Sequence, residues 1–342
     1  MTHMGIDYNN SNSLRTIANN NTQAAAVPME EYRAFFVNQA MTYPSGYEGV
    51  VLSTTAPPPP PAKYVAMGDS FSSGEGSPSF ESGTDEDSVN ECHRSPSAYP
   101  RLLQSHLDLW PTAFVACSGA TTFDVLGSED DNPAGMWDEP SQISALSSDT
   151  QVVTITIGGN DIGFDNFAFN CLFPVDTVIG IEGSCDEYTD IYDDVKDDLN
   201  TLPSKLETVY STILENAPNA TIYVIGYPLM IPHKNYEDAY DQDCGGLYDP
   251  WPNNWGDARA ANEITGILNS KIENAVGSVN TNESTSRLVF VPVDAGAFYG
   301  HDLCSSDSYF NGIFWPNNRE YSIHPNSDGQ TAYAEDVASA IS

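Results

Sequence analysis

The chain has 342 residues, of which 40% are hydrophobic and 11% aromatic. This composition is typical of a globular protein with a sizeable core, not of a disordered chain. Forty-eight acidic residues against 12 basic ones give a formal net charge of −36 at pH 7. Such a surface repels nucleic-acid phosphates and anionic membranes, so we expect no nucleic-acid partner and no stable membrane insertion. The apolar runs are strand-sized, far below the roughly 20 residues of a membrane-spanning helix.

The first part of the chain differs in character from the rest. Residues 29–41 carry aromatic side chains at helical spacing, which predicts a helix there. Five consecutive prolines follow at 57–61, and a run of this kind forms a stiff, extended spacer. We therefore expect residues 1–62 to be an N-terminal extension with a helix and a Pro-rich spacer, and residues 63–342 to be the main domain.

From residue 63 onward, short apolar runs alternate with helical stretches. The runs are rich in Val, Ile, Phe and Tyr, which predicts strands at 63–68, 113–117, 151–157, 221–227 and 287–293. Apolar residues at helical spacing predict helices at 97–107, 188–216, 256–277 and 326–341, with Pro203 as a break or second start in the second of these. Alternation of this kind is typical of the α/β class, here a five-stranded parallel sheet with helices on both faces.

Six cysteines occur, at 92, 117, 171, 185, 244 and 304. None forms a Cys-x-x-Cys pair, which argues against zinc and thioredoxin-type sites. An even number without metal spacing favours three disulfides in an oxidising compartment, and 15 connectivities are open. Sequential pairing would join loops and leave the core strands unlinked. The sequence also lacks the Asp-rich loop of calcium sites, so we expect no metal and no cofactor.

Polar segments stand where four of the predicted elements end or begin. Because the carboxyl ends of parallel strands meet at one edge of a sheet, where ligands bind, we expect these segments to lie close together. They are Gly68-Asp69-Ser70, Cys117-Ser118-Gly119, Gly158-Gly159-Asn160-Asp161 and Ser322-Ile323-His324-Pro325.

These residue types fit nucleophilic catalysis on an ester. Ser70 is a poor nucleophile until a base takes its proton, and His324 is suited because the ordinary pKa of histidine is about 6.5. The oxyanion formed by attack needs preset donors. The backbone N–H groups of Ser70 and Gly119 and the side-chain amide of Asn160 are the candidates. The alternatives are that Ser70 caps a helix and that Asp161 only supports its loop.

These four segments, in this order, resemble the blocks of the SGNH, or GDSL, hydrolase superfamily. Within it, the chain is similar to the secreted esterases and lipases of the Streptomyces scabies esterase type, which share the string seen here as Gly300-His301-Asp302-Leu303-Cys304. The resemblance runs from about residue 63 to the end. It implies a three-layer α/β/α sandwich with a flavodoxin-like strand order and a secreted protein. It also implies three sequential disulfides, Cys92–Cys117, Cys171–Cys185 and Cys244–Cys304.

The resemblance further implies a function. We expect a secreted serine esterase or lipase that hydrolyses carboxylic esters through an acyl-enzyme on Ser70, with His324 as general base and no cofactor. Alternatives are a polysaccharide O-acetylesterase, a phospholipase A1 and, from a different class, a non-catalytic binding module with the same fold. The substrate is accordingly an acyl ester, a lipid or an acetylated glycan. Side chains that line an acyl pocket, or equally belong to the loop core, are Phe71, Phe164, Phe167, Phe173 and Trp315.

The chain departs from the superfamily pattern at one position. Most members carry Asp three residues before the catalytic histidine, where it orients the imidazole, whereas this chain has Tyr321. In the scabies-type branch a main-chain carbonyl at this position accepts the imidazole N–H. We therefore expect the Tyr321 carbonyl to orient His324, with Asp294 at the end of the last predicted strand as the alternative carboxylate.

Overall fold

The computed structural model describes most of the main domain, within the second of two units of the chain, Pro61–Ser342. The described residues are 63–86, 89–107, 109, 112–127, 139–172, 190–230, 255–293, 296–303, 305–312, 314 and 319–342. The extension expected over residues 1–62, with its helix and Pro-rich spacer, lies outside them. The division at residues 62 and 63 therefore stays a prediction.

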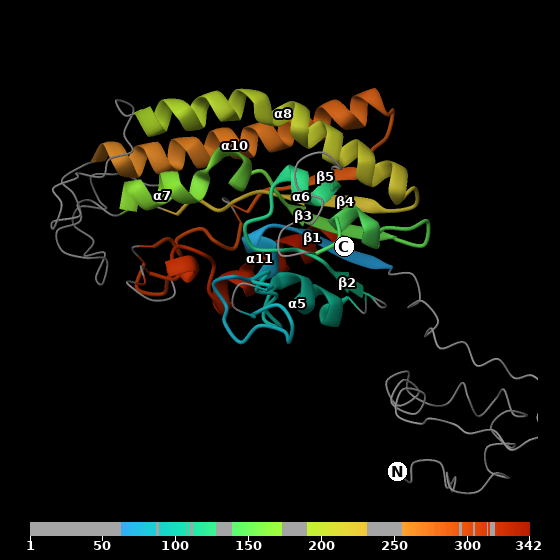
Figure 1. Cartoon of the computed structure of the whole chain (residues 1–342), viewed down its shortest axis with the longest axis horizontal. Coiled ribbons are helices and arrows are strands. Elements are labelled where there is room, and N and C mark those ends of the chain that lie inside the picture. Colours follow the sequence, from blue (N-terminus) through green and yellow to red (C-terminus); the bar gives the residue numbers. More distant parts are fainter. Residues whose placement is uncertain are drawn as a thin grey trace, which may run out of the picture. The chain divides into compact units, whose positions relative to one another are not determined.

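A five-stranded parallel sheet forms the centre of the domain (Figure 1). Its strands are β1 (Tyr64–Gly68), β2 (Thr112–Phe114), β3 (Val152–Thr156), β4 (Thr221–Ile225) and β5 (Leu288–Val291). They lie in the order β2-β1-β3-β4-β5, and each neighbouring pair is parallel. The predicted α/β class, strand number and flavodoxin-like order are confirmed, although each strand is shorter than the range predicted for it.

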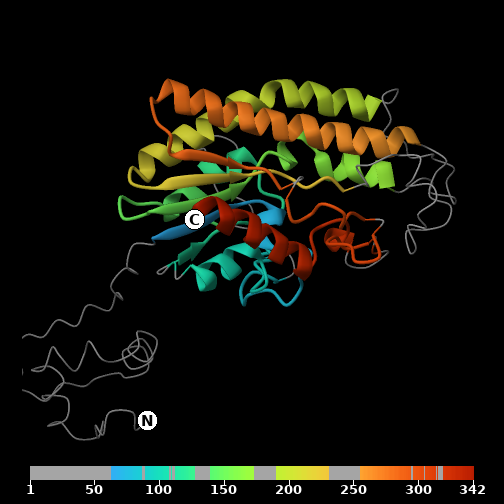
Figure 2. The same cartoon turned by 180° about the vertical axis from the view of Figure 1, so that it is seen from behind.

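Helices cover both faces of this sheet. On one face, α5 (Tyr99–His106) packs against α11 (Ser327–Ile341). On the other, α8 (Asp190–Asn216) packs along α10 (Trp255–Asn282), with α6 (Thr122–Leu126) and α7 (Phe164–Leu172) beside them. Figures 1 and 2 show the three layers from opposite sides. None of the described helices is both long and apolar enough to cross a membrane.

The helix α8 corrects one expectation. Pro203 neither breaks this helix nor starts a second one, and α8 runs without interruption past it. Proline removes one backbone hydrogen bond in a helix interior. Here Leu199, Leu202 and Leu206 around it are fully buried, so packing on both sides of the proline keeps the helix continuous.

The strand order places a crevice beside β1. From β1 the chain passes to β2 on one side of it and then crosses to β3 on the other side, so the loops that leave β1 and β3 diverge. A reversal of this kind is where open α/β sheets bind ligands. Short helical turns begin both loops: α4 (Ser70–Ser73) after β1 and η3 (Asn160–Ile162) after β3. Further short turns are η2 (Gln142–Ala145) and η4 (Arg319–Tyr321).

Candidate active site

Ser70 is the first residue of α4, directly beyond β1. Asp69 is the N-cap of this turn, and its carboxylate accepts a hydrogen bond from the backbone N–H of Phe71 at 3.1 Å. The alternative that Ser70 caps the helix is therefore wrong. The sharp turn needs glycine at Gly68, where φ is +122° and a Cβ atom would lie 2.3 Å from the carbonyl oxygen of Thr156.

His324 reaches Ser70 from the other end of the chain. Its Nε2 atom lies 2.8 Å from Ser70 Oγ, a hydrogen bond between residues 254 positions apart. The imidazole sits just before α11, whose N-cap is Asn326: the Asn326 side chain accepts hydrogen bonds from two backbone N–H groups of the first turn, both at 3.0 Å. Pro325 thus directly precedes the cap of α11. The two residues predicted to form a dyad are in direct contact.

The other ring nitrogen of His324 is not held as expected. Its Nδ1 atom is buried and has no hydrogen-bond partner among the described residues. The Tyr321 carbonyl instead accepts hydrogen bonds from the Asn311 side chain at 3.2 Å and from the backbone N–H of His324 at 3.4 Å. The backbone carbonyls of Ser322 and Glu320, on either side of Tyr321 in the chain, raise the pKa of the imidazole. Asp294, the alternative carboxylate, lies outside the described residues.

The surroundings favour the neutral form of His324. Burial lowers the pKa of the imidazole below its ordinary value of 6.5, because the charged form loses its hydration. The carboxylate of Glu75, the carbonyls of Ser322 and Glu320 and the carboxylate of Asp165 oppose this shift without reversing it. A neutral imidazole within hydrogen-bond distance of a serine hydroxyl can accept its proton.

Two further predicted groups lie on the same cavity as Ser70 and His324. Gly119 occupies the turn after Cys117 with φ of +79°, and Asn160 begins η3 after β3. The Asn160 side chain donates a hydrogen bond to the Ala120 carbonyl at 2.9 Å, which holds the amide beside the Gly119 turn. Within the described chain, the backbone N–H groups of Ser70 and Gly119 donate to no other protein group.

The neighbouring Asp161 has a structural part. Its carboxylate accepts hydrogen bonds from the backbone N–H of Thr122, at 2.9 Å, and from the Thr122 hydroxyl, which ties η3 to the first turn of α6. The Nζ atom of Lys205 on α8 lies 3.7 Å from the same carboxylate. The interpretation of Asp161 as a support for its loop is confirmed.

The cavity has a volume of about 390 Å³, within the range of sites that enclose small molecules. Its apolar lining comes from five side chains: Phe71, Phe164, Tyr227, Met230 and Ile323. The expectation for Phe71 and Phe164 is thus met. Phe167 does not line the cavity: it is fully buried between Phe164 and Tyr192, so its assignment to the pocket is wrong. Phe173 and Trp315 lie outside the described residues.

Sequence reasoning did not identify the role of Asp69. This carboxylate is buried beside the nucleophile and, besides capping α4, accepts hydrogen bonds from the hydroxyls of Thr156, at 2.7 Å, and Tyr227. Burial raises its pKa to about 6 despite these donors. The Tyr227 hydroxyl in turn accepts a hydrogen bond from the Gly159 N–H at 3.1 Å. The sequence signal was an acidic residue directly after a wholly apolar strand.

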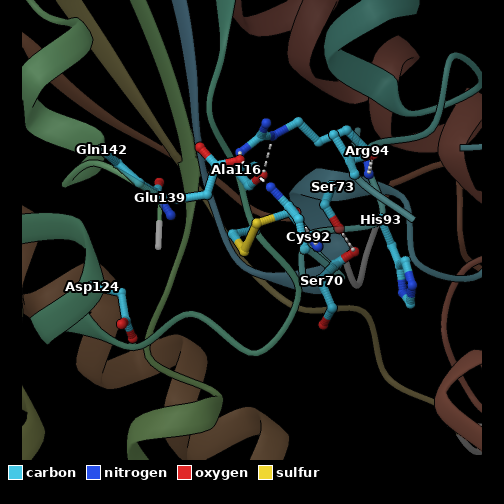
Figure 3. The surroundings of a disulfide bond; sticks show 12 residues. Ser70, Ser73, Cys92, His93, Arg94, Ala116, Asp124, Glu139 and Gln142 are labelled. Carbon is cyan, nitrogen blue, oxygen red and sulfur yellow. Dashed lines mark hydrogen bonds and ion pairs between the residues drawn. A yellow bond between two sulfur atoms is a disulfide. The ribbon is translucent and has the colours of Figure 1, made fainter. Parts of the chain in front are cut away.

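A disulfide lies beside this site. Cys92 and Cys117 are bonded with their Cα atoms 4.1 Å apart, and Figure 3 shows the bond next to Ser70. It joins the Gly119 turn to the preceding loop, where Arg94 donates to the Ala116 carbonyl at 2.8 Å. For the pairs Cys171–Cys185 and Cys244–Cys304 the structure describes no bond, because they involve residues whose placement or side chain it does not describe. They stay predictions.

Among the residues described, no group of three or more His, Cys, Asp or Glu side chains is close enough to hold a metal ion. The polar groups that meet at the cavity are instead a hydroxyl, an imidazole, backbone N–H groups and a side-chain amide. This set of groups can activate a nucleophile and stabilise an oxyanion.

The fold and the cavity define a class, a flavodoxin-like α/β enzyme with its site where the strand order reverses. Within this class, the chain belongs to the GDSL-like Lipase/Acylhydrolase family, which residues 66–332 match. It is 33% identical over 275 residues to Lipase 1 of Streptomyces coelicolor, covering 78% of this chain and 82% of that protein. The expected resemblance to this family is confirmed, and the protein is a carboxylic ester hydrolase.

Solved structures agree with this assignment. Phospholipase A1 from Streptomyces albidoflavus NA297 matches with a TM-score of 0.61 and 31% identity, over 82% of this chain and 99% of that one. The extracellular lipase of Streptomyces rimosus matches with a TM-score of 0.62 and 29% identity, over 81% and 98% of the two chains. The esterase of Streptomyces scabiei is 28% identical over 159 residues, 41% of this chain and 46% of that protein.

Proposed function

We propose that the protein hydrolyses acyl esters through a covalent acyl-enzyme on Ser70, with His324 as general base and then general acid. The observation that carries this proposal is the 2.8 Å contact between Ser70 Oγ and His324 Nε2 at the wall of the cavity. A nucleophile and a base at this distance are the signature of covalent catalysis by serine.

The chemistry follows from the groups that meet there. His324 Nε2 takes the hydroxyl proton as Ser70 Oγ attacks the ester carbonyl carbon. The oxyanion that forms is stabilised by the N–H groups of Ser70 and Gly119 and by the amide of Asn160. His324 then passes the proton to the alcohol oxygen as the ester C–O bond breaks, which leaves the acyl group on Ser70 Oγ. Water attacks this acyl-enzyme while His324 takes one of its protons, and His324 returns that proton to Ser70 Oγ as the acyl–Oγ bond breaks and the carboxylic acid leaves. The lowered pKa of His324 keeps it neutral, and so ready to accept a proton, before the attack of Ser70 and before the attack of water.

The apolar lining supports an acyl chain longer than acetyl as the preferred substrate group. Phe71, Phe164 and Met230 offer hydrocarbon surface next to the nucleophile, whereas an acetyl group needs only a small pocket. The related structures named lipase and phospholipase A1 point the same way. We therefore place lipid-type esters first, phospholipids among them, and keep acetylated polysaccharide as the alternative. A binding module without turnover is the alternative from another class.

Secretion belongs to the same proposal. A disulfide is stable in an oxidising compartment, and the chain has one between Cys92 and Cys117. The related lipase of Streptomyces rimosus is described as extracellular. Detection of the mature protein in the culture medium of its source, with its disulfide intact, is the direct check.

Ester hydrolysis by matched serine variants tests the mechanism. We expect the wild type to hydrolyse p-nitrophenyl octanoate faster than the acetate at pH 8. Ser70→Ala should lose at least about 10³-fold in kcat, while Ser105→Ala, on the exposed side of α5, keeps wild-type rates. Circular dichroism confirms that each variant is folded. Turnover by Ser70→Ala at the wild-type rate would refute the acyl-enzyme on Ser70. Faster wild-type hydrolysis of the acetate than of the octanoate would favour the polysaccharide esterase. No turnover at all by the folded wild type would favour the binding module.

A further inference from the structure

The proposed dyad depends on two loops that come from opposite ends of the domain sequence. Ser70 belongs to the loop that follows β1, and His324 to the loop that precedes α11. A hydrogen bond of 2.8 Å between them persists only if the two backbones keep a fixed separation. The structure shows a direct backbone contact beyond α4. A Cβ atom at Gly76 would lie 2.4 Å from the Pro325 carbonyl oxygen and 2.9 Å from His324 Cβ.

Asn311 bridges these two loops through its side chain. Its Nδ2 group donates to the Gly76 carbonyl at 2.6 Å and to the Tyr321 carbonyl at 3.2 Å. An amide NH₂ group has two hydrogens, so both bonds form at once. The first holds the loop of Ser70, and the second holds the turn three residues before His324. Asn311 does not line the cavity, so it is placed to act on the dyad and not on the substrate.

The backbone of Asn311 also holds the residue next to the base. Its N–H donates to the His324 carbonyl at 2.9 Å, and its carbonyl accepts from the Ile323 N–H at 3.2 Å. Ile323 has a φ of +58°, in the left-handed region that a β-branched residue rarely adopts. A conformation of this kind persists where surrounding contacts impose it. Asn311 supplies two of those contacts, and an isolated bridge between Phe310 and Pro325 continues the pairing.

We infer that Asn311 is a positioning residue for the ester hydrolysis, which sets the distance between Ser70 Oγ and His324 Nε2 by tying the two loops together. The inference rests on the proposed function of this pair. The main-chain bonds of Asn311 keep the His324 loop folded, whereas the side-chain amide fixes its separation from the Ser70 loop. Loss of the amide therefore shifts the base relative to the nucleophile and leaves the substrate cavity intact.

Replacement of Asn311 by Ala tests this directly, because it removes the amide and keeps both main-chain bonds. A displacement of about 1 Å in a catalytic pair costs about 10²-fold in rate. We expect kcat for p-nitrophenyl octanoate to fall about 10- to 100-fold, with KM within about threefold of the wild type. Asn311→Asp, which keeps the shape but has no N–H donor, should lose at least as much.

A control variant of the same residue type is Asn219→Ala, at the amino ends of the strands and away from the cavity. The Asn219 side chain donates to the Ser148 carbonyl at 2.7 Å and joins the loops before β4 and β3. Asn219→Ala loses one exposed bond of the same type, whereas Asn311→Ala loses two that are partly buried. Asn219→Ala should therefore shift the urea midpoint by less than Asn311→Ala and leave kcat unchanged. A wild-type kcat in both Asn311 variants would overturn the inference. So would an unfolded Asn311→Ala, or equal losses of kcat in Asn219→Ala, since each result would mean that the amide acts only on general stability.

The Ser70→Ala variant separates failure of this inference from failure of the proposed function. If Ser70→Ala keeps its activity, the dyad itself is wrong. If Ser70→Ala is inactive and Asn311→Ala turns over at the wild-type rate, the dyad stands and only the positioning role of Asn311 falls.

Discussion

Replacing Asp69 with Asn should remove a pH dependence of stability that the wild type carries. The Asp69 carboxylate is buried, and its pKa is raised from 3.8 to about 6 because burial penalises its charge. Between these two values the folded state binds more protons at this site than the unfolded state. Stability from this group is therefore fully present below pH 3.8 and is lost as the pH rises through about 6.

The size of the effect follows from the two pKa values. They differ by about two pH units, and each unit corresponds to about 1.4 kcal/mol, so the wild type loses about 3 kcal/mol at this site between pH 3.8 and pH 7. The Asn variant has no titrating group there and lacks this slope. It also has a pH-independent loss of about 1–3 kcal/mol, because the amide nitrogen faces the Tyr227 hydroxyl that now donates to Asp69.

Urea unfolding at half-unit steps from pH 4 to pH 7.5 measures both the pH-dependent loss of stability in the wild type and the constant loss in the variant. The wild type should exceed Asp69→Asn in free energy of unfolding by the most near pH 4. This difference should fall by about 3 kcal/mol toward pH 7, so that it reaches zero or changes sign there. Glu215→Gln, on the exposed side of α8, removes the same formal charge outside the core and is the control for the change of net charge alone. A wild type and an Asp69→Asn variant with parallel profiles would show that Asp69 titrates normally in the folded state.

Three further outcomes follow from contacts near the site. Gly68→Ala should destabilise the protein by at least 2 kcal/mol in urea unfolding, roughly the cost of a strained positive φ with a backbone clash; an unchanged midpoint would contradict the geometry of this turn. Glu75→Gln should lower the pKa of His324 further, because the Glu75 carboxylate now opposes the effect of burial, so the acid limb of the kcat/KM profile moves to lower pH. Removing both Cys92 and Cys117, which lie 25 positions apart, should cost about 3–4 kcal/mol of unfolding free energy, and an unaltered urea midpoint would count against this.

Much of the fold was predictable because the signals for it are local. Each strand is a short run of β-branched and aromatic residues, and β1 is buried at all five positions. Alternation with helices then limits the connections to a parallel sheet. Pro203 shows where this reasoning stops. A proline predicts a break from the chain itself, whereas the buried leucines of α8 keep the helix continuous through contacts that no local pattern contains.

The site likewise has a part that the sequence predicts and a part that it does not. The placement of Ser70, Gly119 and Asn160 at one end of the sheet was predictable, because each lies within five residues of the end of its strand and the strand order brings these ends together. The orientation of His324 was not. The Tyr321 carbonyl is occupied by the Asn311 side chain, and the backbone bends at Ile323 into a conformation that its residue type does not favour. The orientation of the His324 ring therefore depends on contacts with Asn311, which lies 10 positions before Tyr321 in the chain.

The hydrogen bonds around Asp69 explain why a buried carboxylate lies beside the nucleophile, although its charge opposes folding near neutral pH. Its Oδ1 atom accepts from the Phe71 N–H and the Thr156 hydroxyl, and its Oδ2 atom accepts from the Tyr227 hydroxyl. Serine or asparagine would cap α4 equally well, but each brings a donor of its own into a place where three donors already converge. Only a carboxylate accepts all three. Through Tyr227 the same network reaches the Gly159 N–H, one residue before Asn160, so a single buried side chain fixes both the turn of the nucleophile and the turn of the amide.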